Sequence, residues 1–259
     1  MSSEKSEAIV LRAVPWSETS LVVTLWTKDF GKISAIAKGA RRIRSPFESA
    51  LDLLAHSSVV FIAKTGDVLD LLTEAKLIRR FRSGQQRLLN LYAGFYVAEL
   101  LLRFTEEGFA IPDVFEYAHE TLESLDTRDD VGEIVLRFEL HLLRLLGHAP
   151  SLDACVGCGK ELGSDNNNTA TNPSVSFGIE AGGIVCEKCL AGQRSIIRIR
   201  ESTRIRLLDV LQSSFHDDIS LQPIPHACKR EIRTLVTRFV CSLLNRSFDL
   251  HPFLEDLAL

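Results

Sequence analysis

The sequence contains no long, uninterrupted apolar run. Its first residues, MSSEKSEAIVLRAV, lack the apolar stretch of a secretory signal peptide, and no later segment approaches the length of a membrane span. We therefore expect a cytoplasmic protein with no membrane partner. Apolar residues make up 46% of the 259 residues and charged residues 25%, which is ordinary usage for a globular protein that needs no disulfides for stability.

The motifs of the common nucleotide-dependent and zinc-dependent enzymes are also missing. There is no GxxxxGK[ST] loop, which excludes a P-loop ATPase. The seven histidines are scattered, and none lies in an HExxH or HxE…PCxxC arrangement, which disfavours zinc hydrolases and deaminases. His141 and His148 flank the end of one predicted helix, but no acidic residue accompanies them at metal-ligand spacing. We therefore expect a protein that is not an enzyme.

A strong excess of charge of one sign is missing as well. The net charge is −4, which by itself gives no indication of a nucleic-acid partner. The charges are unevenly distributed, however: residues 88–150 hold four arginines against twelve acids, whereas the two terminal thirds are locally basic. A mean charge near zero can therefore conceal a basic face that a polyanion would contact.

Cysteines are the most informative residues that are present. Four of the six form two CxxC pairs separated by 27 residues, and each pair can grip one tetrahedral metal ion from a tight turn. Four sulfur ligands leave no open position for water or substrate, so we predict structural Zn²⁺ rather than a zinc enzyme. The alternatives are unrelated reduced thiols or two redox pairs. The predicted metal ligands are Cys155, Cys158, Cys186 and Cys189.

The gap between the two pairs exceeds the roughly 15–20 residues usual in a zinc ribbon. An Asn-rich segment, residues 163–173 (GSDNNNTATNP), accounts for the excess and is predicted to be a mobile loop. Cys228 and Cys241 lie in a helical pattern without metal-ligand spacing, so we expect both in the core.

Short β-branched and aromatic segments separated by turns make up the first 80 residues. Five strands in this length fit a small closed barrel such as the OB-fold, whose open face often binds nucleic acid. The predicted strands are Ile9–Val14, Leu21–Thr27, Ile33–Ala37, Ser57–Ala63 and Val68–Ala75.

The apolar period then becomes helical. One predicted helix follows the barrel, a second opens at Pro112 and a third begins near Val131. After the cysteines, Ser202 is predicted to cap a fourth helix, and Pro225 precedes a fifth.

These patterns predict an α+β multidomain protein in which a zinc-ribbon-like module is inserted into an α-helical domain. The predicted domains are an N-terminal OB-fold β-barrel for nucleic-acid binding (1–80), the first part of the helical domain (81–152), the four-cysteine zinc module (153–192) and the second part of the helical domain (193–259).

A cluster of cations follows the third predicted strand, in residues 38–45 (KGARRIRS), here named the basic loop. Glycine permits a close approach of the backbone to phosphate, and each cation can neutralise one phosphate. The alternative is a solvated charged loop. The predicted DNA-binding residues are Lys38, Arg41, Arg42 and Arg44, together with Lys32 in the preceding turn.

Two further groups of arginines have two possible roles. They either extend the DNA-binding surface or form ion pairs with the acidic helices. Ion pairs are slightly favoured for the group at the domain junction. Trp16 and Trp26 have the chemistry to stack on bases, but their place beside or within barrel strands predicts that both pack in the core. The junction group is Arg79, Arg80, Arg82 and Arg87, and the second group is Arg194, Arg198, Arg200, Arg204 and Arg206.

Several motifs together resemble the bacterial recombination-mediator family RecO. Their order and spacing agree with that family across almost the whole chain, to about Phe253. The motifs are PWSETSL (15–21), FGK (30–32), AKGAR (37–41), LYAGFY (91–96) with ELL (99–101), RFEL (137–140) with LLG (145–147), and the two CxxC pairs.

The resemblance implies binding of single- and double-stranded DNA without base chemistry, and annealing of complementary strands without ATP. It also implies three partners: RecR, the C-terminal tail of single-strand-binding protein and, indirectly, RecA, with association with the nucleoid during repair. Within the basic loop, Lys38 and Arg41 correspond directly to DNA-binding residues of the family, and Arg42 and Arg44 correspond only as part of the same loop. The residues that contact the protein partners are not assigned.

Two alternative hypotheses assign the protein to other functional classes. The first is a zinc-ribbon scaffold or regulator that acts only through protein contacts, in which the basic loop serves solubility. The second is a nuclease or deaminase, which requires an open metal position that four cysteines do not offer.

Overall fold

The computed structural model describes residues 3–66, 68–82, 87–162, 174–213 and 224–244. The chain divides into two compact units, Met1–Ile134 and Val135–Leu259. The Asn-rich segment 163–173 lies outside the described residues.

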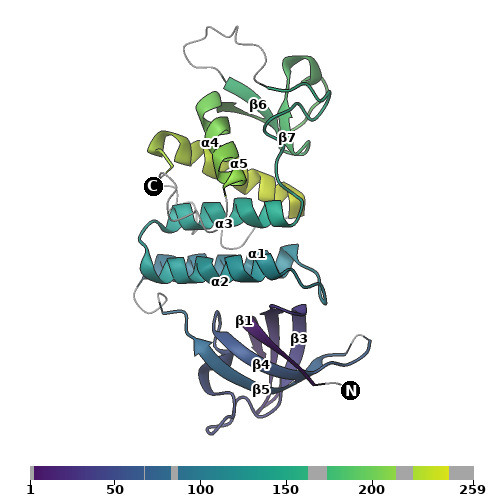
Figure 1. The fold of residues 1–259 in the computed structure, drawn as a ribbon, viewed down its shortest axis with the longest axis vertical. Helices are drawn as coiled ribbons and strands as arrows, with labels where there is room; N and C mark the ends of the chain where they lie inside the picture. Colours follow the sequence, from purple (N-terminus) through teal and green to yellow (C-terminus); the bar gives the residue numbers. More distant parts are fainter. Residues whose placement is uncertain (1–2, 67, 83–86, 163–173, 214–223, 245–259) are drawn as a thin grey trace. The chain divides into compact units, whose positions relative to one another are not determined.

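Five strands of the first unit close into a barrel (Figure 1). Each strand is hydrogen-bonded to two neighbours in the order β1-β2-β3-β5-β4, and β4 returns to pair with β1. All of these pairings are antiparallel except that of β3 with β5, which is parallel. The strands are β1 (Ser3–Pro15), β2 (Leu21–Thr27), β3 (Gly31–Ala37), β4 (His56–Ile62) and β5 (Asp70–Arg79), with a 3₁₀ turn η1 (Glu48–Leu51) before β4.

Alternation of side chains explains how these strands fill the barrel. In β3 every second residue is buried, as expected when successive side chains point to opposite faces of a sheet. The core combines small residues with large ones, which suits the limited width of a small barrel. It includes Ala8, Ala35, Ala37, Leu25, Phe47, Phe61 and Leu72.

Two helices complete the first unit, α1 (Leu88–Phe104) and α2 (Pro112–Thr127). Pro112 occupies the first turn of α2, where its missing N–H is tolerated. The Asn90 side chain donates a hydrogen bond of 2.7 Å to the carbonyl of Leu125 and so joins the two helices. On the barrel, Ile9, Trp26 and Lys32 are paired in register across three strands, and the Lys32 ammonium donates to the carbonyl of Leu102 at the end of α1. The end of α1 therefore covers this outer row of the barrel.

The second unit combines helices with a small sheet in the order β7-β6-β8. Phe177 of the sheet contacts Phe239 of a helix edge to face, with ring centroids 5.9 Å apart. A buried ion pair joins Glu139 and Arg233 at 2.5 Å. The elements are α3 (Val131–Leu145), which crosses the division between the units, β6 (Ser174–Gly178), β7 (Gly183–Val185), a 3₁₀ turn η3 (Glu187–Cys189), β8 (Ile196–Arg200), α4 (Glu201–Gln212) and α5 (His226–Leu244).

The predicted barrel strands and helices are present, and the sheet of the second unit was not predicted. Its strands are short, three to five residues each, and β8 runs directly into α4. The prediction that Ser202 caps the fourth helix is wrong, because α4 already begins at Glu201 and no side chain caps it. Within the described residues, no helix has the length and apolarity needed to cross a lipid bilayer.

Candidate metal centre and nucleic-acid interface

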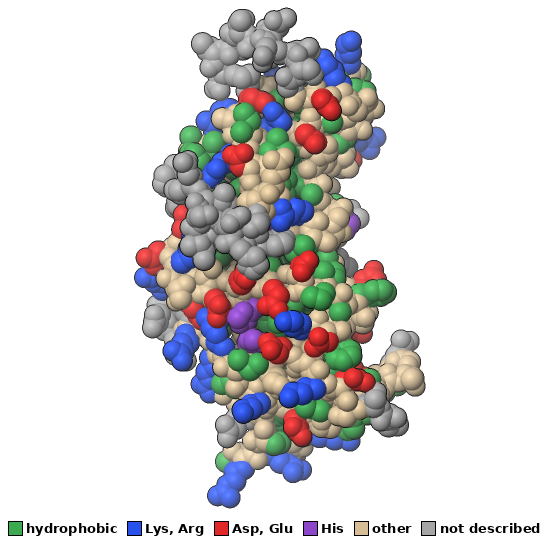
Figure 2. All heavy atoms as spheres, in the orientation of Figure 1, with side chains coloured by type: hydrophobic (Ala, Val, Ile, Leu, Met, Phe, Trp, Pro, Cys, Tyr) green, Lys and Arg blue, Asp and Glu red, His purple; other side chains and the backbone are tan. Residues whose placement is uncertain are grey.

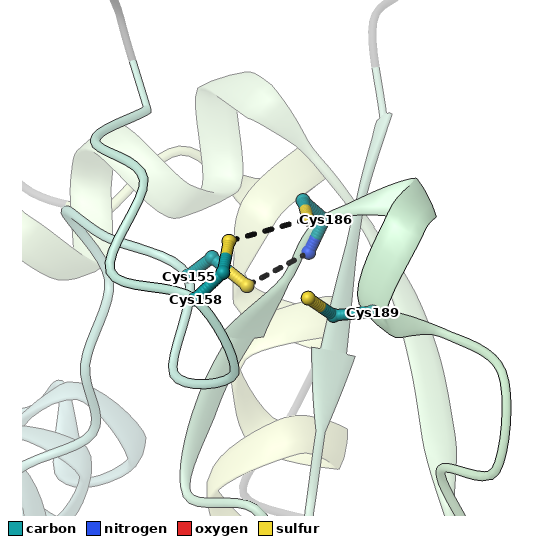
Figure 3. Close-up of side chains that lie close together, drawn as sticks. All are labelled: Cys155, Cys158, Cys186 and Cys189. Atoms are coloured by element: carbon teal, nitrogen blue, oxygen red, sulfur yellow. Dashed lines mark hydrogen bonds between the residues drawn. The ribbon is translucent and has the colours of Figure 1, made fainter.

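The four cysteines predicted as metal ligands meet at one point in the second unit (Figure 3). Cys155 and Cys158 come from the turn that precedes β6. Cys186 follows β7 and immediately precedes η3, and Cys189 is the last residue of η3. Backbone hydrogen bonds hold both turns, with Gly159 N–H donating to the Cys155 carbonyl at 2.8 Å and Cys189 N–H to the Cys186 carbonyl at 2.9 Å. The structure thus brings all four predicted ligands together.

The spacing of the sulfur atoms fits a tetrahedral site. All four Sγ atoms lie within 4.8 Å of one another, and the Sγ atoms of Cys158 and Cys186 are 3.8 Å apart. Four sulfurs at about 2.3 Å from a central zinc ion would be separated by about 3.8 Å. Gly157 makes room for this approach, because a Cβ at that position would lie 3.1 Å from the Cβ of Cys189.

Electrostatics of the cluster favour a cation. The Cys186 backbone N–H donates to the Cys155 sulfur at 3.3 Å, and this bond is the main reason that the pKa of Cys155 is lowered to about 6. Hydrogen bonding with Cys186 and then Cys158 raises the pKa of Cys189 to about 12. A first thiolate therefore forms readily, while the last proton is held by the surrounding sulfurs. A divalent cation would supply the positive charge that lets all four ionise.

This donor set can hold one metal ion and does not suit catalysis at that ion. None of the four clustered cysteines forms a disulfide, so no such bond competes with a metal ion. A closed set of four sulfur donors leaves no coordination position for substrate. The four cysteines could therefore hold a metal ion, and their donor set has the chemistry of a structural rather than a catalytic site.

The basic loop leaves β3 and presents its cations to solvent. Lys38, Arg41, Arg42 and Arg44 are all exposed, and none forms an ion pair with any residue that the structure describes. Gly39 has a φ of +79°, a conformation open to glycine, and its carbonyl accepts the Arg42 N–H at 3.1 Å. Figure 2 shows Lys and Arg as the main charged side chains over the lower end of the barrel in that view. These unpaired cations are available to a polyanion.

Comparison with known proteins identifies the family. The family model for the N-terminal part of recombination protein O matches residues 1–81, and the model for its C-terminal part matches residues 85–249. The chain belongs to the RecO family. A DNA repair protein RecO of Rhodopirellula baltica is 37% identical over 270 residues, covering 96% of this chain and 98% of the relative. Two more relatives bear the same name: one of Halalkalibacterium halodurans (26% identical, covering 98% of this chain and 94% of the relative) and one of Listeria monocytogenes (28%, 85% and 82%).

Lys32 has a different place from the rest of the predicted DNA-binding set. Its ammonium donates to the carbonyl of Leu102 at 2.8 Å and also to that of Thr105, both at the end of α1. A cation at a helix C-terminus is stabilised by the orphan carbonyls and the helix dipole. Burial lowers the pKa of Lys32, opposed by the nearby charges of Glu107 and Glu106. Lys32 therefore ties α1 to the barrel in this member of the RecO family, and we do not propose it as a phosphate contact.

The junction arginines also form contacts within the protein. Arg79 is 2.5 Å from Asp126 and 3.4 Å from Glu123, both on α2, and Arg87 pairs with Asp129. The preference for ion pairs is thereby confirmed for Arg79 and Arg87. Arg80 instead donates to the Ser49 hydroxyl, and Arg82 contacts Asp126 through its backbone N–H.

Ion pairs also account for part of the second arginine group. Arg200 bonds Glu231 at 3.0 Å, and Arg204 bonds Glu201 and the carbonyl of Leu152. Arg194 and Arg198 of the same group are exposed, and neither forms an ion pair with a described residue.

The two tryptophans have opposite environments. Trp26 is fully buried, as predicted, whereas Trp16 leaves 66% of its surface exposed, so the prediction that it packs in the core is wrong. Trp16 follows the last residue of β1 and lies in the turn 16–20 rather than on a strand face. Proline and serine beside it in PWSETS are turn-forming residues, and this signal was available in the sequence.

Proposed function

We propose that this RecO family member is a recombination mediator in DNA repair that binds DNA and is not an enzyme. The single observation that carries the proposal is the set of exposed cations in the basic loop, which lack carboxylate partners among the described residues, whereas Arg79 and Arg87 at the junction have them. Family membership and the names of the relatives, DNA repair protein RecO, support the role in repair.

The barrel is the proposed DNA-binding domain, and we assign it to the OB-fold. Five strands, a β1-β2-β3 meander and closure between β1 and β4 support that assignment. Lys38, Arg41, Arg42 and Arg44 would bind backbone phosphates on single- and double-stranded DNA. Phosphate contacts provide affinity with little sequence preference, as a mediator that acts throughout a genome requires.

Annealing follows from the same chemistry. Two complementary strands repel each other through their phosphates, and a protein that neutralises part of this charge lowers the barrier to pairing. The step needs no ATP, in keeping with the lack of a P-loop motif in the sequence. The four cysteines are proposed to hold structural Zn²⁺, which fixes the two turns that carry them.

The remaining proposals rest on the family resemblance. The protein would bind RecR and the C-terminal tail of single-strand-binding protein, and would help to load RecA onto coated single strands. Its proposed location is the cytoplasm, with nucleoid association during repair. No residues are assigned to these protein contacts.

The test of DNA binding compares two charge-matched triple variants. K38A/R42A/R44A removes three cations of the basic loop, and K5A/K64A/K76A removes three exposed lysines elsewhere on the barrel that also lack described ion-pair partners. Arg41 is retained because its guanidinium donates to the carbonyl of Ser17 at 2.7 Å. Binding of a labelled oligothymidine and of a labelled duplex is measured by fluorescence anisotropy between 50 and 200 mM salt.

The slope of log K against log salt changes by roughly 0.7 for each lost phosphate contact on a single strand. K38A/R42A/R44A should therefore make the slope shallower by about 2, while K5A/K64A/K76A leaves it as in the wild type. Equal slopes in both variants would place the DNA site away from the basic loop. If the wild-type protein bound neither oligonucleotide, the scaffold that acts only through protein contacts would replace the present proposal.

A second experiment tests mediation itself. Annealing of complementary strands coated with single-strand-binding protein is followed with and without the tail of that protein. We expect faster annealing when the tail is present, and equal rates would contradict the proposed tail contact.

A further inference from the structure

Trp16 differs from an ordinary exposed apolar residue in its surroundings. Single exposed apolar side chains are common on protein surfaces and need no function to explain them. Trp16, however, is 66% exposed immediately beside the basic loop, while Trp26, the other tryptophan of the chain, is fully buried. An exposed indole next to unpaired cations has the chemistry of a single-strand binding surface.

The turn that carries Trp16 is held by hydrogen bonds. The Trp16 N–H donates to the carbonyl of Ser20 at 3.0 Å, and the Ser17 N–H donates to the same carbonyl at 3.3 Å. The Ser17 hydroxyl oxygen accepts the Ser20 N–H at 3.1 Å. Pro15 precedes the turn and restricts its own φ. The backbone beneath the indole is thus fixed before any ligand arrives, which lowers the entropy lost on binding.

Arg41 joins this turn to the basic loop. Its guanidinium donates to the carbonyl of Ser17 at 2.7 Å, and its backbone N–H donates to the carbonyl of Thr19 at 3.0 Å. One cation is therefore bonded to the residue that follows Trp16. Beyond it, residues 40–46 line an open hollow of about 550 Å³. Arg41 consequently links the turn that carries the exposed Trp16 to the loop that carries the cations.

We propose that Trp16 stacks on an unpaired base of a single DNA strand whose phosphates are bound by the basic loop. This inference rests on the proposed DNA-binding function and adds to it the class of ligand, an unpaired base. Stacking of bases on aromatic side chains is independent of sequence because every base has a π-face.

Stacking by Trp16 would favour single-stranded DNA over duplex DNA. In a duplex both faces of an internal base are covered by its neighbours, so an indole has no free face to contact. In a single strand a face is available, and stacking on it leaves the Watson–Crick edge free. Trp16 would thus hold a base in a state that a complementary strand can still pair with, as annealing requires.

A protein partner is the competing occupant, since tryptophan and arginine are also frequent in protein hot spots. The charge of the surface favours the nucleic acid. Arg41 is bonded to the turn that carries Trp16, three more cations lie in the same basic loop, and Glu18 is the one acid within the turn 16–20. A repeating anion matches this surface better than an ordinary protein surface of mixed charge.

Fluorescence gives a direct test, because the chain holds two tryptophans. W26F leaves Trp16 as the sole indole, and W16F leaves the buried Trp26. The W26F substitution keeps an aromatic ring and removes an indole N–H that has no hydrogen-bond partner among the described residues. Titration with unlabelled oligothymidine should quench the emission of Trp16 in W26F and leave that of Trp26 in W16F unchanged.

Affinity provides the second measurement. With labelled oligothymidine, W16A should weaken binding roughly 5- to 150-fold, the usual effect of removing one stacking side chain. W16F, which keeps an aromatic face, should retain more affinity than W16L, which is apolar without a π-face. Duplex affinity and the salt slope should be unchanged in W16A, because no charge is removed. The thermal midpoint of W16A is measured alongside to confirm that the protein remains folded.

The outcomes distinguish this inference from the function on which it rests. If the wild type binds oligothymidine but Trp16 emission does not change and W16A binds normally, stacking is overturned while DNA binding stands. Equal losses on single strand and duplex in W16A would also overturn it, since they would assign Trp16 to the shape of the loop. If the wild type binds neither DNA, the proposed function itself fails.

Discussion

Replacing Lys32 by methionine should destabilise the first unit without changing DNA affinity. Methionine keeps an apolar stem of similar length and removes the ammonium that donates to the carbonyls of Leu102 and Thr105. These two carbonyls belong to the end of α1, whose last carbonyls have no partner within the helix. Loss of Lys32 should therefore weaken the attachment of α1 to the row of the barrel that contains Trp26.

The loss of stability expected for K32M follows from the type of the two hydrogen bonds and from their exposure to water. A hydrogen bond to a charged group contributes about 1.5–3 kcal/mol when it is buried. Lys32 is only partly buried, so water can replace some of this interaction, and burial of the ammonium already carries a cost that lowers its pKa. We therefore expect the two bonds together to contribute about 1–3 kcal/mol to the free energy of unfolding.

The assay uses Trp26 as a local reporter. In a W16F background the buried Trp26 is the sole tryptophan, and it is paired in register with Lys32. Urea unfolding followed by its emission reports on the first unit separately, which matters because a chain of two units need not unfold in one step. K5M, at an exposed position on β1, is the control and should leave the unfolding curve unchanged.

DNA binding by the same variants completes the test. Both K32M and K5M should bind oligothymidine with the wild-type salt slope. An unchanged unfolding curve for K32M, together with a salt slope shallower by about 0.7, would refute the reasoning and make Lys32 a phosphate contact after all.

Two further predictions concern the cysteines and His56. Purified protein should contain one metal ion for its four clustered cysteines. The C155S variant should lose the ion and destabilise the second unit, whereas the C228A variant should keep it. Purified protein that contains no metal, and whose unfolding does not respond to a chelator, would contradict this prediction. Burial, and then repulsion by His119, lowers the pKa of His56 from its ordinary 6.5, against the opposing effect of Glu7. The unfolded state then takes up the proton first, so the first unit should lose stability as the pH falls below about 6.5. Urea unfolding followed by Trp26 emission gives the free energy of unfolding at pH 7.5 and at pH 5.5. The difference between these two free energies should be smaller in H56Q than in the wild type, and an equal difference would exclude His56 as its source.

The strands and helices were predictable where a local pattern was long enough. The short β-branched and aromatic runs separated by turns in the first 80 residues identify barrel strands without knowledge of their partners. The sheet formed by Ser174–Gly178, Gly183–Val185 and Ile196–Arg200 was missed because strands of three to five residues carry too little periodicity. Their pairing is set by the fold around the cysteines, and local propensity has little weight in such short segments.

The four-cysteine cluster was predictable for a different reason. Spacing within each CxxC pair fixes two sulfurs near one point, because two intervening residues form one tight turn. Only the meeting of the two pairs, across a gap of 27 residues, required the tertiary structure, and the 3.8 Å between the Cys158 and Cys186 sulfurs supplied it.

The sequence alone determined the family, the four candidate metal ligands and the position of a basic loop, since each depends on residues close together in the chain. The tertiary structure decided which charges and rings remain available to a ligand. Lys32 and Lys38 are six residues apart, yet α1 takes up the ammonium of the first and leaves the second in solvent. Trp26 is covered and Trp16 is not. The physical reason is that a side chain is exposed or buried according to which distant segments of the chain pack over it. A local sequence pattern does not contain that information.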